Sequence, residues 1–336
     1  MKPLAIATQS TGTLSVNQSQ QSGKRSVRYE TILLIIVAAV VVIIAIGSHG
    51  NFWSSSNLTS LFVNAAITAV PAIGMTMVIV MGGIDVSIGS VVGLTATVAG
   101  LAFEQNWPIA LVVVLTLVTG AIAGLINAWF IASRKLPPII VTLGTMSIWR
   151  AVVYALLGGN WISTIPMTLT TWFVLDKLWV IPWSFVLTVA IVLVAAYMLR
   201  RRPMGRHVYA IGSNEEAAGV LGLPTKRVKY MAYVFLGALT AIAALMTLGQ
   251  SPLVQATTGS GFELDVIAAV VIGGTSILGG RGTVIGSLLG AILTQLISDG
   301  VILFQIQPFW NGVVTGAMII IAVIMSLLNQ RGAAHE

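Results

Sequence analysis

Long apolar runs without a charged side chain alternate with short polar segments along the whole 336-residue chain. The clearest runs cover residues 86–103, 105–133, 178–199, 230–262 and 300–330. A helix that crosses a bilayer needs about 20 mostly apolar residues, so most of these runs can hold one or two such helices. The alternation of apolar and polar residues in segments of about ten, which is typical of a membrane β-barrel, is missing. The pattern therefore predicts an all-α fold, a polytopic bundle of transmembrane helices.

The limits of the runs divide the chain into one transmembrane domain, residues 31–329, and two tails, residues 1–30 and 330–336. We expect about ten spans in the domain, from the length that a bilayer requires. They are placed at residues 31–47, 58–81, 86–103, 108–132, 137–157, 178–199, 230–249, 263–279, 283–304 and 310–329. The N-terminal tail is rich in Ser, Gln and Thr, a composition that favours disorder.

The composition and the positions of the charges agree with this division. The chain is 57% hydrophobic and 8% charged, with a mean hydropathy of +0.96, whereas soluble domains carry about 25% charged residues. Every Lys and Arg except Arg150 and Lys177 falls in the tails or in segments 133–136, 200–229 and 280–282. By the positive-inside rule these segments and both termini are cytoplasmic. The net charge of +7 is thus explained by membrane topology, and we expect no nucleic-acid partner.

Glycines gather in two similar stretches, GGIDVSIGSVVG at 82–93 and GGTSILGGRGTVIGSLLGA at 273–291. Each stretch predicts the end of one helix, a Gly-Gly break, and a second helix with small residues on one face. Such a face lets two membrane helices approach closely. A broken helix along a transport path is the alternative, since irregular backbone is tolerated where it lines a cavity. The residues expected to serve packing or hinge motion are Gly82, Gly83, Gly282, Gly286 and Gly290.

Motifs of enzymes and metal sites are missing from the sequence. It contains no G-x-x-x-x-G-K-[ST] phosphate loop, no G-x-S-x-G and no cysteine, and its three histidines are scattered. We therefore expect a non-catalytic chain that binds no metal and no cofactor.

A few ionisable residues lie within or beside the spans. Charged groups are costly in a bilayer and often mark a transport path, although capping and pairing explain them equally well. A proton- or ion-coupled secondary transporter that uses Asp85 or Glu263 is accordingly one interpretation of the chain.

The stretch SNEEAAGVLGLP, residues 213–224, has the features of a short soluble helix. Ser213 and Glu216 have the spacing of a capping box, and the acidic residues favour the N-terminal end of the helix dipole. Gly222 suits the C′ position, and Pro224 prevents continuation. A helix of about two turns needs packing to be stable, and a small apolar face suits a docked partner. The residues expected in this contact are Ser213, Glu215, Glu216, Ala217, Ala218 and Gly222.

These residues also carry a family resemblance. Glu216-Ala217-Ala218 with Gly222 resembles the EAA loop of ATP-binding-cassette importer permeases, whose short coupling helix sits in a groove of the ATPase subunit. Together with the two glycine-rich stretches, the chain from about residue 30 to residue 330 resembles the ribose/xylose-type sugar permeases. The segment GGNWISTIP is similar to the branch that carries autoinducer-2 and rhamnose. One departure is that Leu223-Pro224 follows the glycine at once, where the wider pattern has it about ten residues later.

The resemblance implies a membrane-spanning permease subunit of an ATP-driven importer for a monosaccharide or related small carbohydrate, in the inner membrane of a bacterium. It also implies three kinds of partner: an ABC ATPase that uses the ATP, an external substrate-binding protein, and a second permease subunit, identical or different. Sugars are held by polar groups and aromatic faces. Our candidates for the translocation path are Asn64, Asp85, Asn127, Trp149, Asn160, Trp161 and Glu263.

Overall fold

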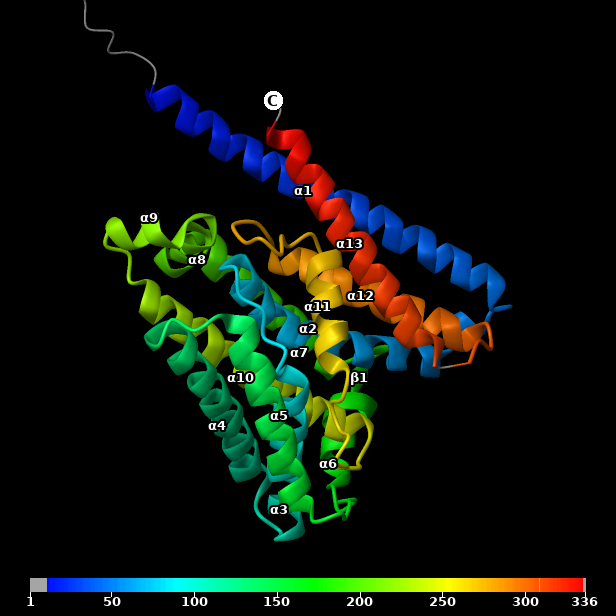
Figure 1. Cartoon of the computed structure of the whole chain (residues 1–336). Helices are drawn as coiled ribbons and strands as arrows, with labels where there is room; N and C mark the ends of the chain where they lie inside the picture. Colours follow the sequence, from blue (N-terminus) through cyan, green and yellow to red (C-terminus); the bar gives the residue numbers. More distant parts are fainter. Residues whose placement is uncertain (1–10, 308, 335–336) are drawn as a thin grey trace, which may run out of the picture.

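The computed structural model describes the backbone of residues 11–307 and 309–334, and these residues are mostly helical (Figure 1). Its longer helices are α1 (Thr11–Gly47), α2 (Ser55–Val80), α3 (Ile88–Glu104), α4 (Ile109–Ala128), α5 (Pro138–Leu157), α7 (Trp183–Arg201), α10 (Thr225–Gln250), α12 (Val284–Leu303) and α13 (Trp310–Ala334). Shorter helices are α6 (Met167–Thr170), α8 (Pro203–Ser213), α9 (Glu215–Val220), α11 (Phe262–Ile272), the 3₁₀ helix η1 (Asn51–Trp53), and the π-helical η2 (Trp129–Ser133) and η3 (Thr171–Leu175). In the described part of the chain, one small antiparallel hairpin of β1 (Lys177–Leu178) and β2 (Ile181–Pro182) interrupts the helices.

The expected polytopic helical bundle is confirmed. Among the described residues, seven helices are long and apolar enough to cross a membrane, and α3 and the described apolar part of α13 are somewhat shorter. The span expected at residues 263–279 is wrong as one continuous helix. Its helix, α11, ends at Ile272 because Gly273 and Gly274 turn the chain, and α12 begins only at Val284.

The segments expected outside the spans gather at two ends of the bundle. At the end expected to be cytoplasmic, the Gly280 amide of segment 280–282 donates a hydrogen bond to the carbonyl of Val80, the last residue of α2. Ser133 of segment 133–136 forms a hydrogen bond with Tyr230, next to segment 200–229. At the other end, a β-bridge between Ile162 and Val254 joins two segments expected to be external. This grouping agrees with the predicted topology. The cytoplasmic location of the termini stays a prediction. Of the tail expected to be disordered, residues 1–10 lie outside the described residues, and α1 begins at Thr11.

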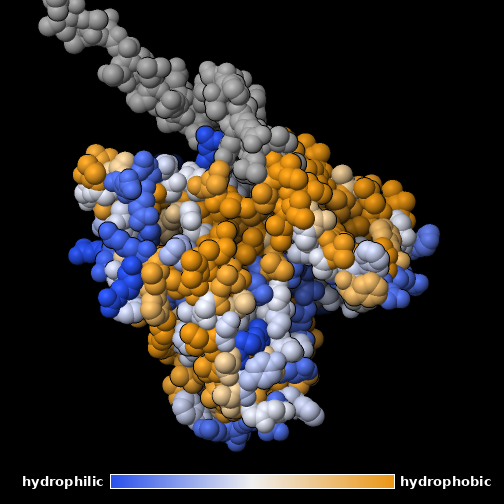
Figure 2. Space-filling view, viewed as in Figure 1, coloured by the Kyte–Doolittle hydropathy of each residue, from blue (hydrophilic) through white to orange (hydrophobic). Residues whose placement is uncertain are grey.

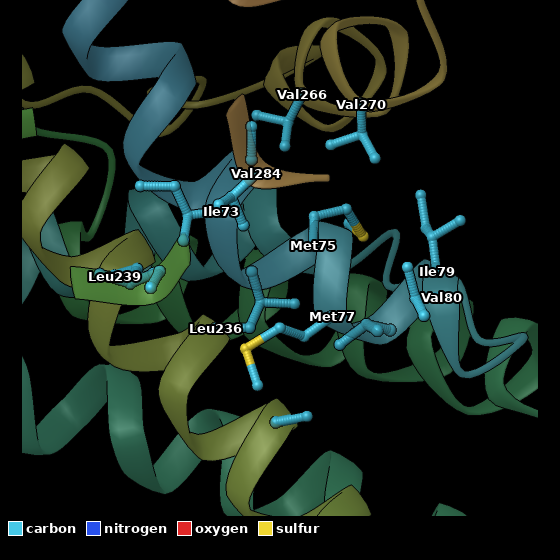
Figure 3. Close-up of a cluster of buried hydrophobic side chains, with 14 of the residues drawn as sticks. Ile73, Met75, Met77, Ile79, Val80, Leu236, Leu239, Val266, Val270 and Val284 are labelled. Carbon is cyan, nitrogen blue, oxygen red and sulfur yellow. The ribbon is translucent and has the colours of Figure 1, made fainter. Parts of the chain in front are cut away.

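Helix α2 forms the centre of the bundle, with nearly all of its spanning window buried. Figure 3 shows Ile73 and Met75 of α2 packed among side chains of α10, α11 and α12. Glycines allow the closest approach: a Cβ added at Gly237 of α10 would collide with the carbonyl oxygen of Gly120 on α4. Such close van der Waals packing is one of the forces that associate membrane helices.

The outer surface is apolar over α4, α5 and α7, and Figure 2 shows an apolar belt between more hydrophilic ends. Exposed residues such as Leu193 and Val194 of α7 have no partner helix within the part of the chain described. A bilayer around the belt removes this surface from water.

Candidate coupling surface and polar residues of the membrane domain

Helices α8 and α9 project from one end of the bundle (Figure 1). Helix α8 was not predicted, because the sequence indicates a short helix only at residues 213–224 of the cytoplasmic segment 200–229. Pro203 occupies the first helical turn, where its missing N–H costs nothing. Val208 and Ile211 are buried, and a Cβ at Gly205 would collide with the carbonyl oxygen of Leu199. The spacing of the two apolar residues is the signal that could have revealed this helix.

The cap of α9 differs from the expected one. The side chain of Asn214, one residue later than predicted, accepts a hydrogen bond of 2.9 Å from the Ala217 amide. Ser213 is the last residue of α8, and its hydroxyl donates to the Tyr209 carbonyl. The capping box between Ser213 and Glu216 is therefore wrong. Asn and Ser cap equally well, so the choice between adjacent residues depends on where α8 ends.

The C-terminal end of α9 is as expected. Gly222 has a φ of +77° and occupies the C′ position. Its amide donates to the Gly219 carbonyl, and the Leu223 amide donates to the Ala218 carbonyl, both at 3.0 Å. These two bonds define a Schellman motif, which stops the helix and satisfies its last carbonyls.

The outward face of α9 is apolar at its tip. Val220 and Leu221 are 89% and 79% exposed, whereas Ala218 is buried against the bundle. Glu216 and Ala217 are also exposed. Glu215 forms an ion pair of 2.6 Å with Lys229 of α10. The helix is thus anchored on one side and presents apolar and acidic groups on the other.

The structure brings two of the path candidates together, at the break between α2 and α3. Asp85 accepts hydrogen bonds from the Ser87 amide and hydroxyl, at 2.8 and 2.6 Å, and from the Asn127 amide nitrogen at 3.0 Å. Asn127 also donates to the Ser87 hydroxyl at 2.9 Å. All three side chains are buried. A buried carboxyl needs such donors, and these bonds fasten the break to α4.

The other path candidates lie apart from this network. Asn64 accepts a 2.7 Å hydrogen bond from Gln250, joining α2 to α10. The indole nitrogen of Trp149 is buried without a hydrogen-bond partner among the described residues. Asn160 and Trp161 are exposed in the segment after α5.

Arg150 of α5 also makes polar contacts within the membrane domain, although it is not among the path candidates. Its Nη1 donates to the carbonyl oxygens of Ala256 and Thr258, both at 2.8 Å. Glu263 lies in the same region, because a Cβ added at Gly89 of α3 would collide with its carboxylate. These contacts hold the segment before α11 against α3 and α5. The carbonyls come from a loop whose position a linear pattern does not indicate.

The glycine candidates differ in their environment. A Cβ at Gly286 or Gly290 would collide with a backbone carbonyl of the α11 side, so this pair packs α12 against α11. Gly82 has a φ of +79°, and Gly83 faces the Tyr233 hydroxyl. Gly282 precedes α12 and has a φ of +156°. Gly282 lies four residues before Gly286 and was expected on the same helix face, but it lies outside the helix.

Known proteins resemble this chain over most of its length. Residues 57–323 match the family described as branched-chain amino acid transport system / permease component. The autoinducer 2 import system permease protein LsrC of Photorhabdus laumondii subsp. laumondii is 33% identical over 297 residues, which are 88% of each protein. LsrC of Yersinia pestis (strain Pestoides F) is 34% identical over 272 residues, 80% of this chain and 77% of that protein.

Proposed function

From the premise that the chain belongs to the family of permease components of the branched-chain amino acid transport type, we propose that it is the translocating subunit of an ATP-driven importer. Its place is the inner membrane of a bacterium, which it crosses several times. The helices of the bundle form the path, and ATP is hydrolysed by a separate subunit.

The proposed cargo is a small carbohydrate or a carbohydrate-derived signal such as autoinducer-2. The observation that carries this choice is the similarity to the autoinducer-2 import permeases, which extends over 88% of this chain. The family description names branched-chain amino acids, whereas the names of these relatives specify autoinducer 2.

The coupling surface in this proposal consists of α8 and α9. The exposed Val220 and Leu221 enter a groove of an ABC ATPase, and the Schellman motif at Gly222 fixes their orientation. An external binding protein delivers the substrate, and a second permease subunit completes the path.

An ion-coupled secondary transporter is the competing function. It requires a carboxylate that exchanges protons or ions with water on both sides of the membrane. Asp85 is only 3% exposed and accepts three hydrogen bonds, an arrangement that favours a structural role. This geometry argues against ion coupling at Asp85, whereas the half-buried Glu263 stays a candidate for the competing function.

Energy dependence separates the two functions. Cells that express the chain with its partner subunits are depleted of ATP while a proton gradient is maintained, and uptake of labelled substrate is measured. We expect uptake to stop. Uptake that continues under these conditions would favour the secondary transporter.

Docking is tested at the end of α9. Gly222→Leu disturbs the left-handed C′ residue, and Ala217→Asp adds a charge at the proposed contact. We expect both variants to insert normally but to lose the ATPase in a pull-down or to hydrolyse ATP without uptake. Gly222→Asn is the matched control, since Asn tolerates the left-handed conformation better than Leu. Wild-type binding and uptake in both test variants would contradict the docking surface.

A further inference from the structure

The segment between α11 and α12, residues 273–283, forms a compact turn that we term the Gly-rich loop. The Ser276 amide donates to the Arg281 carbonyl at 2.9 Å, which closes the loop on itself. Gly279 and Gly280 have φ values of +87° and +74°. These left-handed residues let the backbone turn tightly and leave room for other backbone segments to approach.

Helix α8 touches this loop through both a side chain and its backbone. The Tyr209 hydroxyl donates a 2.8 Å hydrogen bond to the Gly282 carbonyl, two residues before the start of α12. A Cβ added at Gly279 would lie 2.8 Å from the Gly212 carbonyl oxygen. A Cβ added at Gly280 would lie 3.2 Å from the Ser213 hydroxyl. A tyrosine hydroxyl is protonated and can donate at neutral pH, and burial raises the pKa of Tyr209 further above its ordinary value.

Two further helices hold the same loop region. The Gly280 amide donates to the carbonyl of Val80, the last residue of α2, at 2.8 Å. On α1, the Tyr29 hydroxyl donates to the Ile272 carbonyl at 2.8 Å, and Glu30 accepts from Thr283 at 2.6 Å. A single loop therefore connects α1, α2 and α8 to the α11–α12 pair.

The coupling surface leads directly into these contacts. Asn214 caps α9 and bonds to the Ala210 carbonyl of α8, so no flexible linker separates the two short helices. A displacement of α9 must therefore move α8. Helix α8 is in turn hydrogen-bonded to the loop at Gly282, one residue before the cap of α12. The glycine contacts between α11 and α12 then make this pair move together.

We propose that Tyr209 and the Gly-rich loop transmit the movement of the coupling surface to α11 and α12. Tyr209 is a positioning residue in this scheme: it links α8 to the start of α12 and touches neither substrate nor nucleotide. The inference rests on the proposed importer function and adds the route by which docking at α9 reaches the membrane helices.

The first test removes one hydroxyl. Tyr209→Phe is compared with wild type in a reconstituted complex of permease, ATPase and binding protein. The matched control is Tyr230→Phe, which removes an equivalent hydroxyl bonded at 2.7 Å to Ser133, away from the loop. A hydrogen bond of this kind shifts an equilibrium by about fivefold. We expect uptake per ATP hydrolysed to fall about fivefold in Tyr209→Phe, with complex recovery and ATP hydrolysis unchanged.

The outcomes of this test separate coupling from stability. Equal uptake per ATP in Tyr209→Phe and wild type would overturn the inference, and so would an equal decrease in the Tyr230→Phe control. A wild-type complex without ATP-dependent uptake would instead contradict the proposed function itself. The two failures are therefore distinguishable.

A cross-link gives a second test that does not depend on losing a bond. The chain has no cysteine, and an added Cβ at Gly280 would lie 3.5 Å from the Ser213 Cα, close enough for a disulfide. In Ser213→Cys with Gly280→Cys, we expect oxidation to leave uptake at the level of the reduced double variant, since α8 and the loop move together. The reduced form also serves as the control for strain at the left-handed Gly280. Loss of uptake on oxidation, restored by reduction, would show that the two segments must separate and would overturn the inference.

Discussion

Replacing Gly290 with alanine tests the close packing of α11 and α12, because close packing predicts that the substitution lowers the stability of the protein rather than raising it. Within an exposed helix, Gly→Ala stabilises by about 1 kcal/mol because alanine has the higher helix propensity. At Gly290 the added Cβ would collide with the Ala269 carbonyl oxygen and lie 2.9 Å from the carbonyl carbon. Carbon atoms in optimal contact are about 3.5–4.0 Å apart, so the helices must separate by up to about 1 Å. Overpacking of this kind costs about 1–3 kcal/mol, which outweighs the gain in propensity.

The assay is thermal unfolding of the purified permease in detergent. Gly316→Ala on α13 is the matched control, because a Cβ there meets no atom within 4 Å. We expect the midpoint to fall for Gly290→Ala and to stay constant or rise for Gly316→Ala. A Gly290→Ala midpoint equal to or above that of the control would refute the packing argument.

Three further predictions concern the cap of α9, the topology and the buried network. Asn214→Ala should speed hydrogen exchange of the α9 amides, since a lost cap costs about 1 kcal/mol, whereas Ser213→Ala should leave the exchange unchanged. Faster exchange in Ser213→Ala and unchanged exchange in Asn214→Ala would instead support the capping box. Reporter fusions at Gly159 should report the external side of the membrane, and fusions at Arg202 the cytoplasmic side. An inverted pattern would reject the predicted topology. Asn127→Ala should lower the unfolding midpoint by leaving a buried carboxyl and hydroxyl short of a donor, a loss of about 1–3 kcal/mol, and an unchanged midpoint would contradict the role of the network.

Features that depend on local backbone geometry could be predicted from the sequence. The C′ role of Gly222 follows from a polar helix that ends before a proline, and the structure confirms it. The small face of α12 follows from the spacing of Gly286 and Gly290, and both meet the backbone of the α11 side. In each case the requirement lies within a few residues of the chain.

Features that depend on distant contacts were not predicted. Whether Ser213 or Asn214 caps α9 depends on the length of α8, which is set by packing of Val208 and Ile211 on the bundle. The partners of Arg150 are carbonyls more than a hundred residues away. No charged residue follows Ile272 until Arg281, so the absence of charge extended that span beyond the turn.

The same limit applies to the candidate site. The sequence indicated α9 as a docking helix but gave no sign of the Gly-rich loop as its neighbour, because Tyr209 and Gly282 meet only in the folded chain. Likewise, Asp85 and Asn127 were selected separately as path candidates, and only the fold brings them into one buried network.

ATP-driven flux through the purified complex tests the central claim most directly. Proteoliposomes that contain this chain and its ATPase, with binding protein on the opposite face, are supplied with labelled autoinducer-2 and either ATP or a non-hydrolysable analogue. We expect transport across the bilayer only with ATP and binding protein, and no competition from an excess of leucine. Transport driven by an imposed proton gradient in the absence of ATP would contradict the account.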